Sequence, residues 1–216
     1  MEVTLEQLFN EHLDFRLSNL FTCMVGVITN VVSLEEQRIH VQPLVNRVYK
    51  DGEIQEYPSL LSIPVQFPSS SSSALTFPLH QGDTVILVFS QKGLDVFKSG
   101  SQTPHDPVDM RAFDKRDAFA IPCVFPFGKA INGQAQRTLP HDTDDMVVAH
   151  NIGTDSECEI RLKKSGVVEV YGNNIQIKST TEVDGTLTCT RGATGSFTTP
   201  TGNVVTVSDG IVTNIF

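Results

Sequence analysis

The sequence contains no tryptophan and only three tyrosines, and it has no excess of basic charge. Sixteen Lys and Arg residues stand against 25 Asp and Glu residues, which gives a formal net charge of −9 at pH 7. A nucleic-acid-binding domain needs a basic patch against the phosphates, and a surface for single strands also needs exposed aromatic rings. The composition therefore argues against a nucleic-acid partner, and the few scattered tyrosines argue against a carbohydrate-binding platform.

Cysteine is also scarce, and the four residues Cys23, Cys123, Cys158 and Cys189 form no Cys-x-x-Cys pair. We predict unpaired, buried thiols, with a disulfide as the alternative. No apolar run reaches the ~20 residues of a membrane-spanning helix. The sequence has no Ser/His/Asp order, no glycine-rich phosphate loop, no zinc spacing and no carboxylate pair typical of a glycosidase. We therefore predict that the protein is not an enzyme and has no cofactor, no catalytic residue and no metal site.

The sequence contains one acidic cluster whose side chains are of types that bind metal ions. Residues 141–145 read His-Asp-Thr-Asp-Asp, and His150 follows nearby, so the segment carries ligand types that suit a hard metal ion. It lacks the glycine and the distal glutamate of a calcium loop, and Pro140 precedes it. We interpret it as a solvated acidic loop.

Residues 4–20 place apolar side chains at helical spacing. These side chains are Leu5, Leu8, Phe9, Leu13, Leu17 and Leu20. Thr4 and Gln7 have the spacing of a capping box, in which each side chain bonds the other residue's backbone N–H. The spacing predicts an amphipathic helix that docks either on its own domain or in the groove of a partner.

Residues 22–128 have the pattern of short strands separated by turns. The apolar segments 25–32, 38–48, 65–67 and 84–89 alternate with the turn residues Gly52 and Gly82 and with the serine run 69–73. About five strands in roughly a hundred residues are typical of a small closed β-barrel of the OB type.

The last third of the chain alternates polar and apolar residues in segments 160–164, 167–171 and 175–178, with glycine-containing turns between them. Since side chains alternate across a strand, each segment presents its apolar residues on one face. These residues are Ile160, Leu162, Val168, Val170, Ile175 and Ile177. With no helix or aromatic cluster to cover that face, such a segment needs further copies of itself to bury a core.

Seven short motifs together resemble the amino-terminal domain of the central spike proteins of contractile-tailed phage baseplates. They are VQPL at 41–44, IPVQFP at 63–68, LTFPL at 75–79, Gly82-Asp83, VFS at 88–90, Leu94-Asp95 and RDAFAIP at 116–122. The segment GIVT at 210–213 is similar to the ending of many baseplate proteins. No single motif is specific, but the set follows the order of the family across most of residues 22–125.

The resemblance implies an all-β protein with an amino-terminal helix (1–21), an OB-fold domain (22–128), a linker (129–149) and an intertwined trimeric β-helix needle (150–216). It implies a structural virion protein, made in the bacterial cytoplasm. This homotrimeric central spike would plug the tail tube, dock on a baseplate hub protein and cross the host outer membrane transiently on sheath contraction. The six residues above would then line the trimer core. The alternative is an OB-fold binding module for carbohydrate or nucleic acid.

The end of the chain departs from the family pattern. Several such spikes hold a metal ion at the tip through His-x-His pairs, but no two of the six histidines here are separated by one residue. Asp209-Gly210 instead predicts a hairpin between segments 204–207 and 211–215. We predict a terminal β cap built on Val205, Val207, Ile211 and Ile215, which either docks a separate tip protein or closes the trimer.

Overall fold

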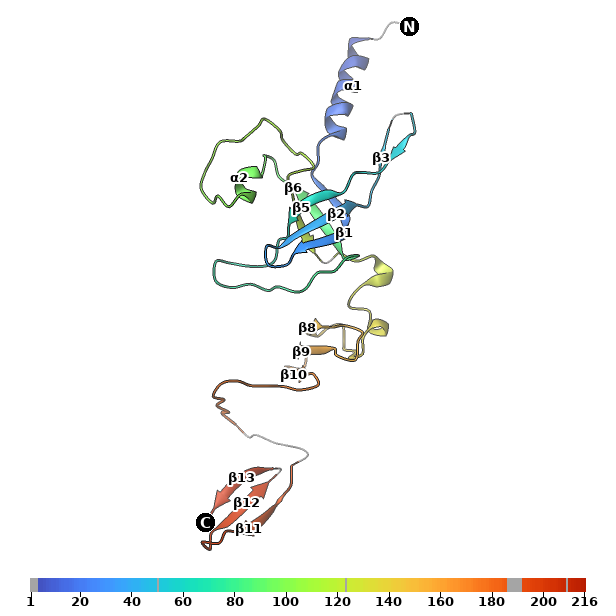
Figure 1. Cartoon of the computed structure of the whole chain (residues 1–216). Coiled ribbons are helices and arrows are strands. Elements are labelled where there is room, and N and C mark those ends of the chain that lie inside the picture. Colours follow the sequence, from blue (N-terminus) through green and yellow to red (C-terminus); the bar gives the residue numbers. More distant parts are fainter. Residues whose placement is uncertain (1–3, 50, 123, 186–191, 209) are drawn as a thin grey trace. The chain divides into compact units, whose positions relative to one another are not determined.

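The computed structural model describes residues 4–49, 51–122, 124–185, 192–208 and 210–216 (Figure 1). The chain divides into two compact units, Met1–Gly133 and Gln134–Phe216. Regular structure is mostly strand, so the predicted all-β class with an amino-terminal helix is confirmed. Within these ranges no helix has both the length and the apolar character needed to cross a bilayer.

The predicted helix forms as α1 (Leu5–Ser18). Its capping box is confirmed, because the Gln7 N–H donates to the Thr4 hydroxyl oxygen at 3.2 Å and the Thr4 N–H donates to the Gln7 side chain at 2.9 Å. None of its residues is buried within the chain. The apolar side chains predicted to dock on a surface are therefore uncovered in the single chain.

The first unit contains a curled five-stranded sheet. Its strands are β1 (Cys23–Ser33), β2 (Arg38–Pro43), β5 (Leu60–Pro64), β6 (Thr84–Phe89) and β7 (Ala118–Pro122), and they lie in the order β5-β2-β1-β6-β7. All neighbours are antiparallel, and a parallel bridge between Val65 and Ala120 brings the two edges together. The result is a partly closed, OB-like barrel, as the strand pattern predicts.

Alternation along the strands builds the core of this barrel. β2 buries Ile39 and Val41, and β6 buries Val85, Leu87 and Phe89, while the residues between them face outward. The strand predicted at 65–67 does not form: this segment lies just beyond β5 and has only an isolated bridge at Val65. Pro64 and Pro68 on either side of it lack the N–H groups that a ladder requires. Val65 and Phe67 are nevertheless buried in the core.

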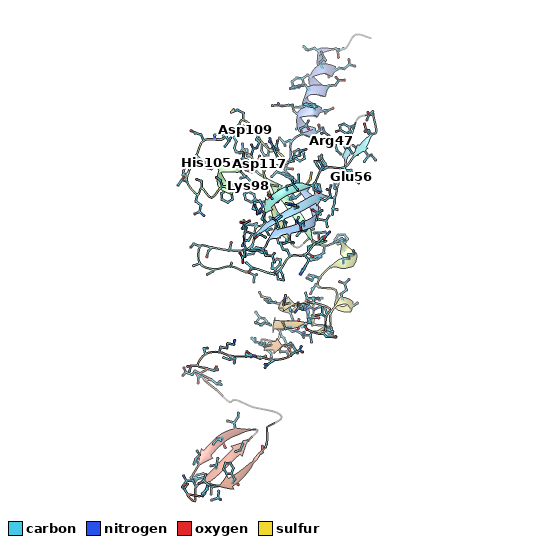
Figure 2. All side chains as sticks on the ribbon, viewed as in Figure 1. Arg47, Glu56, Lys98, His105, Asp109 and Asp117 are labelled. Atoms are coloured by element: carbon cyan, nitrogen blue, oxygen red, sulfur yellow. The ribbon has the colours of Figure 1, made fainter. Side chains whose placement is uncertain are left out.

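A hairpin and a long loop extend from the barrel. The hairpin consists of β3 (Arg47–Val48) and β4 (Ile54–Gln55), and the loop between β6 and β7 contains the short helix α2 (Asp95–Lys98). Figure 2 labels residues of both segments, among them Arg47 on β3, and Lys98 and Asp117 at the loop.

Arg111 holds this loop through three carboxylates. Its guanidinium group pairs with Asp117 and Asp109, each at 2.6 Å, and also with Asp95. Asp117 is buried and accepts a further hydrogen bond from the Leu94 N–H at 2.8 Å. Burial alone would raise the pKa of Asp117, but the hydrogen bonds from Arg111 and Leu94 outweigh it and lower the pKa. The cluster is a structural clamp whose charges are paired.

The second unit contains two small antiparallel sheets. β8 (Met146–His150), β9 (Cys158–Leu162) and β10 (Val168–Tyr171) lie in the order β10-β9-β8. β11 (Gly195–Thr198), β12 (Val204–Ser208) and β13 (Ile211–Ile215) form a meander in sequence order. Two short 3₁₀ turns, η1 (Phe127–Lys129) and η2 (Gln134–Gln136), occur in the segment before β8.

The strands predicted at 160–164 and 167–171 correspond to β9 and β10, and the predicted terminal hairpin corresponds to β12 and β13. The segment predicted as a linker, 129–149, contains most of β8, whose continuous run of apolar residues pairs with β9. The strand predicted at 175–178 does not form, and in the described part of the chain no strand lies beside it to pair with.

The cysteine prediction needs correction in part. Cys23 and Cys158 carry free thiols, as predicted, but Cys23 is exposed and Cys158 is half-buried. Cys23 begins β1, outside the buried stretch of that strand. Cys123 and Cys189 lie outside the described residues.

Candidate functional site

The sheet β8–β9–β10 exposes a continuous apolar face. The strand register aligns Met146 with Leu162 and Val168, and it aligns Val148 with Ile160 and Val170. Alternation places these six side chains on one side of the sheet. All six are exposed, and the exposed fractions range from 44% for Leu162 to 64% for Met146.

The opposite face of the same sheet is polar and covered. Glu159 and Arg161 on β9 are buried, and they lie beside Tyr171 and Glu169 of β10. Arg161 lies over the Tyr171 ring at 4.8 Å and pairs with Glu159, and the Tyr171 hydroxyl donates to Glu169 at 2.7 Å. A single chain thus buries charges on one face of this sheet and exposes hydrocarbon on the other.

Arg137 lies in the segment that precedes β8, and its side chain covers part of the polar face. Its guanidinium lies 2.6 Å from a Glu159 carboxylate oxygen and 3.2 Å from one of Glu157, and all three side chains are almost fully buried. Because the charges are paired and hydrogen-bonded, their burial is tolerated. The pairs fix the 137–141 segment over the polar side, so that segment cannot also cover the apolar side.

Glu157 is the anchor of this network. Its carboxylate accepts hydrogen bonds from the Thr138 N–H at 2.7 Å, the Thr138 hydroxyl at 2.6 Å and the Gly153 N–H at 3.0 Å. Burial alone would raise the pKa of Glu157, but these hydrogen bonds and the charge of Arg137 lower it to about 2. The carboxylate is therefore ionised at neutral pH and holds two loops together.

The six exposed apolar side chains of the β8–β10 sheet favour contact with another apolar surface. Burying the exposed half of one such side chain gains about 1 kcal/mol, so covering all six gains on the order of 5 kcal/mol per chain. Contiguous apolar patches of this kind mark interaction sites in soluble proteins. We take the face formed by Met146, Val148, Ile160, Leu162, Val168 and Val170, here named the apolar face, as the candidate functional site.

Four of the six residues predicted for a trimer core lie on the apolar face: Ile160, Leu162, Val168 and Val170. The other two, Ile175 and Ile177, are exposed in a segment that pairs with no strand in the described part of the chain. The sequence prediction omits Met146 and Val148, because residues 146–149 form a continuous apolar run in which no alternation marks one face. It also omits the Arg137 network, because its charges are indistinguishable in sequence from solvated ones.

The terminal sheet brings together most of the predicted cap. Register places Val205 beside Phe197 and Ile215, and places Val207 beside Val212 on the same face. Val205 is buried, whereas Phe197 and Ile215 are exposed. Ile211 pairs with Ser208 and so lies on the other face, because a bulge between Thr206 and Val207 changes the alternation of the pairs.

The acidic segment 141–145 is tied back to the sheet. Lys164, in the turn between β9 and β10, lies 2.6 Å from an Asp142 carboxylate oxygen and 3.2 Å from one of Asp144. Hydrogen bonding from Lys164 lowers the pKa of Asp142. Across the described ranges, no three His, Cys, Asp or Glu side chains are grouped in a way that suits a metal ion.

Comparison with known families concerns the barrel. Residues 27–123 match the family model described as the phage protein Gp138 N-terminal domain. The match begins within β1 and runs just past β7, so it covers part of β1 and all of β2, β5, β6 and β7. It supports a phage structural protein of the baseplate or spike type that is associated with the virion. No curated protein matches the chain.

Proposed function

We propose that the chain is the homotrimeric central spike of a contractile-tail baseplate. In this proposal three copies of residues 150–216, together with β8, form an intertwined β-helix needle that pierces the host outer membrane when the sheath contracts. The barrel and α1 dock on the baseplate hub and plug the tail tube. The role is mechanical rather than enzymatic, and it needs no cofactor.

The observation that carries the proposal is the inverted arrangement of the β8–β10 sheet. In an ordinary monomer the apolar face of a sheet would be packed and the charged face solvated. Here the ion network of Arg137, Glu157, Glu159 and Arg161 occupies the covered face, and the apolar face is open. Three such sheets facing one axis bury their apolar residues and keep the charged network outside.

The segment after β10 supports the same arrangement. Residues 173–185 are exposed and pair with no strand in the described part of the chain, yet Ile175 and Ile177 continue the apolar alternation. Unpaired backbone groups in an extended segment are a template for pairing with another chain. In the proposed needle, neighbouring copies supply those hydrogen bonds, and repeated interchain pairing gives the stiffness that piercing requires.

The decisive experiment compares two valine substitutions by light scattering. The unmodified protein is expected to have a native mass near three times 23.7 kDa. Val170→Asp on the apolar face would place three carboxylates in a dry core and should yield monomers. Val108→Asp, at an exposed valine of the β6–β7 loop, is the matched control and should stay trimeric. A trimer that survives Val170→Asp, or a monomeric unmodified protein, would refute the proposal.

Position and role in the virion need their own experiment. Antibody labelling of phage particles should place the chain at the distal end of the baseplate. Particles carrying Val170→Asp should lack the central spike and fail to deliver DNA. Labelling along the tail tube or the capsid would contradict the proposed position.

A further inference from the structure

On β9 and β10 the two edges of the apolar face differ in side-chain size. At one edge the register stacks Met146, Leu162 and Val168, which we name the bulky column. At the other edge β8 and β9 contribute the paired residues His150 and Cys158. Gly172 follows β10 at the same edge, because a Cβ placed on it would lie 3.5 Å from the Cβ of Cys158. We name Cys158 and Gly172 the small column, because their side chains are smaller than those of Leu162 and Val168 on the same two strands; His150 on β8 is large and is not part of it.

We propose that each copy inserts its bulky column into the small column of the next copy around the trimer axis. The inference rests on the proposed trimer and specifies how it closes. The middle positions Val148, Ile160 and Val170 then lie nearest the axis. In this arrangement, Leu162 on β9 of one copy contacts Cys158 on β9 of the next copy. On β10, Val168 of one copy contacts Gly172 of the next.

Symmetry supports this pairing of unlike edges. In a cyclic trimer every contact is heterologous, so one edge of a subunit always meets the opposite edge of its neighbour. Close packing requires that large residues face small ones across an interface. On β9 and β10 the sheet has one edge of each kind, which fits a closed ring.

The inference can be tested because the paired residues are distant within one chain. Leu162 and Cys158 are four residues apart on β9, and a strand rises ~3.3 Å per residue, so they are separated by ~13 Å. Residues more than ~10 Å apart contribute independently to stability when they share no partner. A strong energetic coupling between Leu162 and Cys158 would therefore indicate contact between copies.

The first test exchanges the sizes of the two residues. Leu162→Ala leaves a cavity and Cys158→Leu overfills the small column, so each should raise the concentration of half-dissociation by about tenfold or more. The double variant restores the combined volume and should return to within about threefold of the unmodified protein. Light scattering over a dilution series gives these values. Additive losses in the double variant would overturn the inference.

The second test links the columns covalently. In a chain whose Cys23, Cys123 and Cys189 are changed to serine, Leu162→Cys should form a disulfide with Cys158 of the next copy. Mild oxidation should then give covalent trimers on a denaturing gel. Ser165→Cys, an exposed position in the β9–β10 turn, is the control and should stay unlinked.

The two tests separate the inference from the trimer itself. A protein of trimeric native mass that shows no cross-link and no coupling would refute the column pairing and leave the proposed trimer intact. A monomeric native mass for the unmodified protein would refute both.

Discussion

Replacing the buried carboxylate of Glu157 by an amide should weaken the fold of the second unit measurably. Its pKa is lowered from 4.5 to about 2. Each unit of pKa shift corresponds to about 1.4 kcal/mol, which sets an upper limit of ~3 kcal/mol. Because the network lies on a single small sheet with solvent close by, screening reduces this, and we expect Glu157→Gln to cost about 1–2 kcal/mol at pH 7.

The loss of unfolding free energy caused by Glu157→Gln should become smaller as the pH falls. A carboxylate with a lowered pKa stabilises the folded state fully above its unfolded pKa, and that contribution disappears as pH falls through the folded pKa. For Glu157 the window runs from pH 4.5 down to about 2. The difference in unfolding free energy between the unmodified protein and Glu157→Gln should therefore be largest at pH 7 and vanish near pH 2.

Urea unfolding followed by circular dichroism, at one fixed chain concentration, measures this difference. Glu36→Gln is the control, because Glu36 is exposed and pairs with Arg38 on the barrel surface. It should change the unfolding free energy by less than about 0.5 kcal/mol at every pH. A difference between Glu157→Gln and the unmodified protein that stays constant from pH 7 to pH 2 would refute the reasoning.

Three further substitutions probe the first unit. Gly26→Ala should cost about 1–3 kcal/mol in thermal unfolding, because the added Cβ would lie 2.4 Å from a methyl group of the buried Val41. Asp117→Asn should cost about 2–4 kcal/mol in urea unfolding at pH 7, since it leaves the charge of Arg111 without its most buried partner. Thr4→Ala should cost about 1 kcal/mol of helix stability, visible as faster hydrogen exchange in the first turn of α1.

Each of the three has a matched control. Gly128→Ala adds a Cβ with no atom within 4 Å and should be neutral, so an equal loss at both glycines would contradict the packing argument. Asp106→Asn removes an exposed carboxylate of the same loop and should change little. Thr4→Ser keeps the capping oxygen and should preserve the slow exchange that Thr4→Ala loses. An equal effect of serine and alanine would argue against the cap.

Local patterns account for the parts of the fold that depend on neighbours in sequence. The capping box of Thr4 and Gln7 specifies the start of α1, and strict alternation specifies β9 and β10. The same alternation predicts a strand at 175–178, which does not form alone because strand formation requires a pairing partner. The alternation is visible within residues 175–178, but the hydrogen bonds of a strand must come from another segment or another chain.

The candidate site is predictable only in part for a related reason. The apolar residues of β9 and β10 are evident from their period, whereas β8 is a continuous apolar run without that period, inside a segment interpreted as linker. The Arg137–Glu159 pair joins residues far apart in the chain and has no period at all. Which face of the sheet is covered therefore depends on a tertiary ion network that no short motif encodes.

The barrel and the β8–β10 sheet differ in what each needs to become stable. Among the described residues, thirteen apolar side chains are buried in the barrel within one chain, so the barrel can fold at a rate independent of concentration. Among the described residues, none covers the apolar face of the sheet. In the proposed spike, the barrel therefore forms first on each chain, and the needle follows only when three chains meet. The yield of spikes should depend steeply on how many copies the infected cell makes at one time.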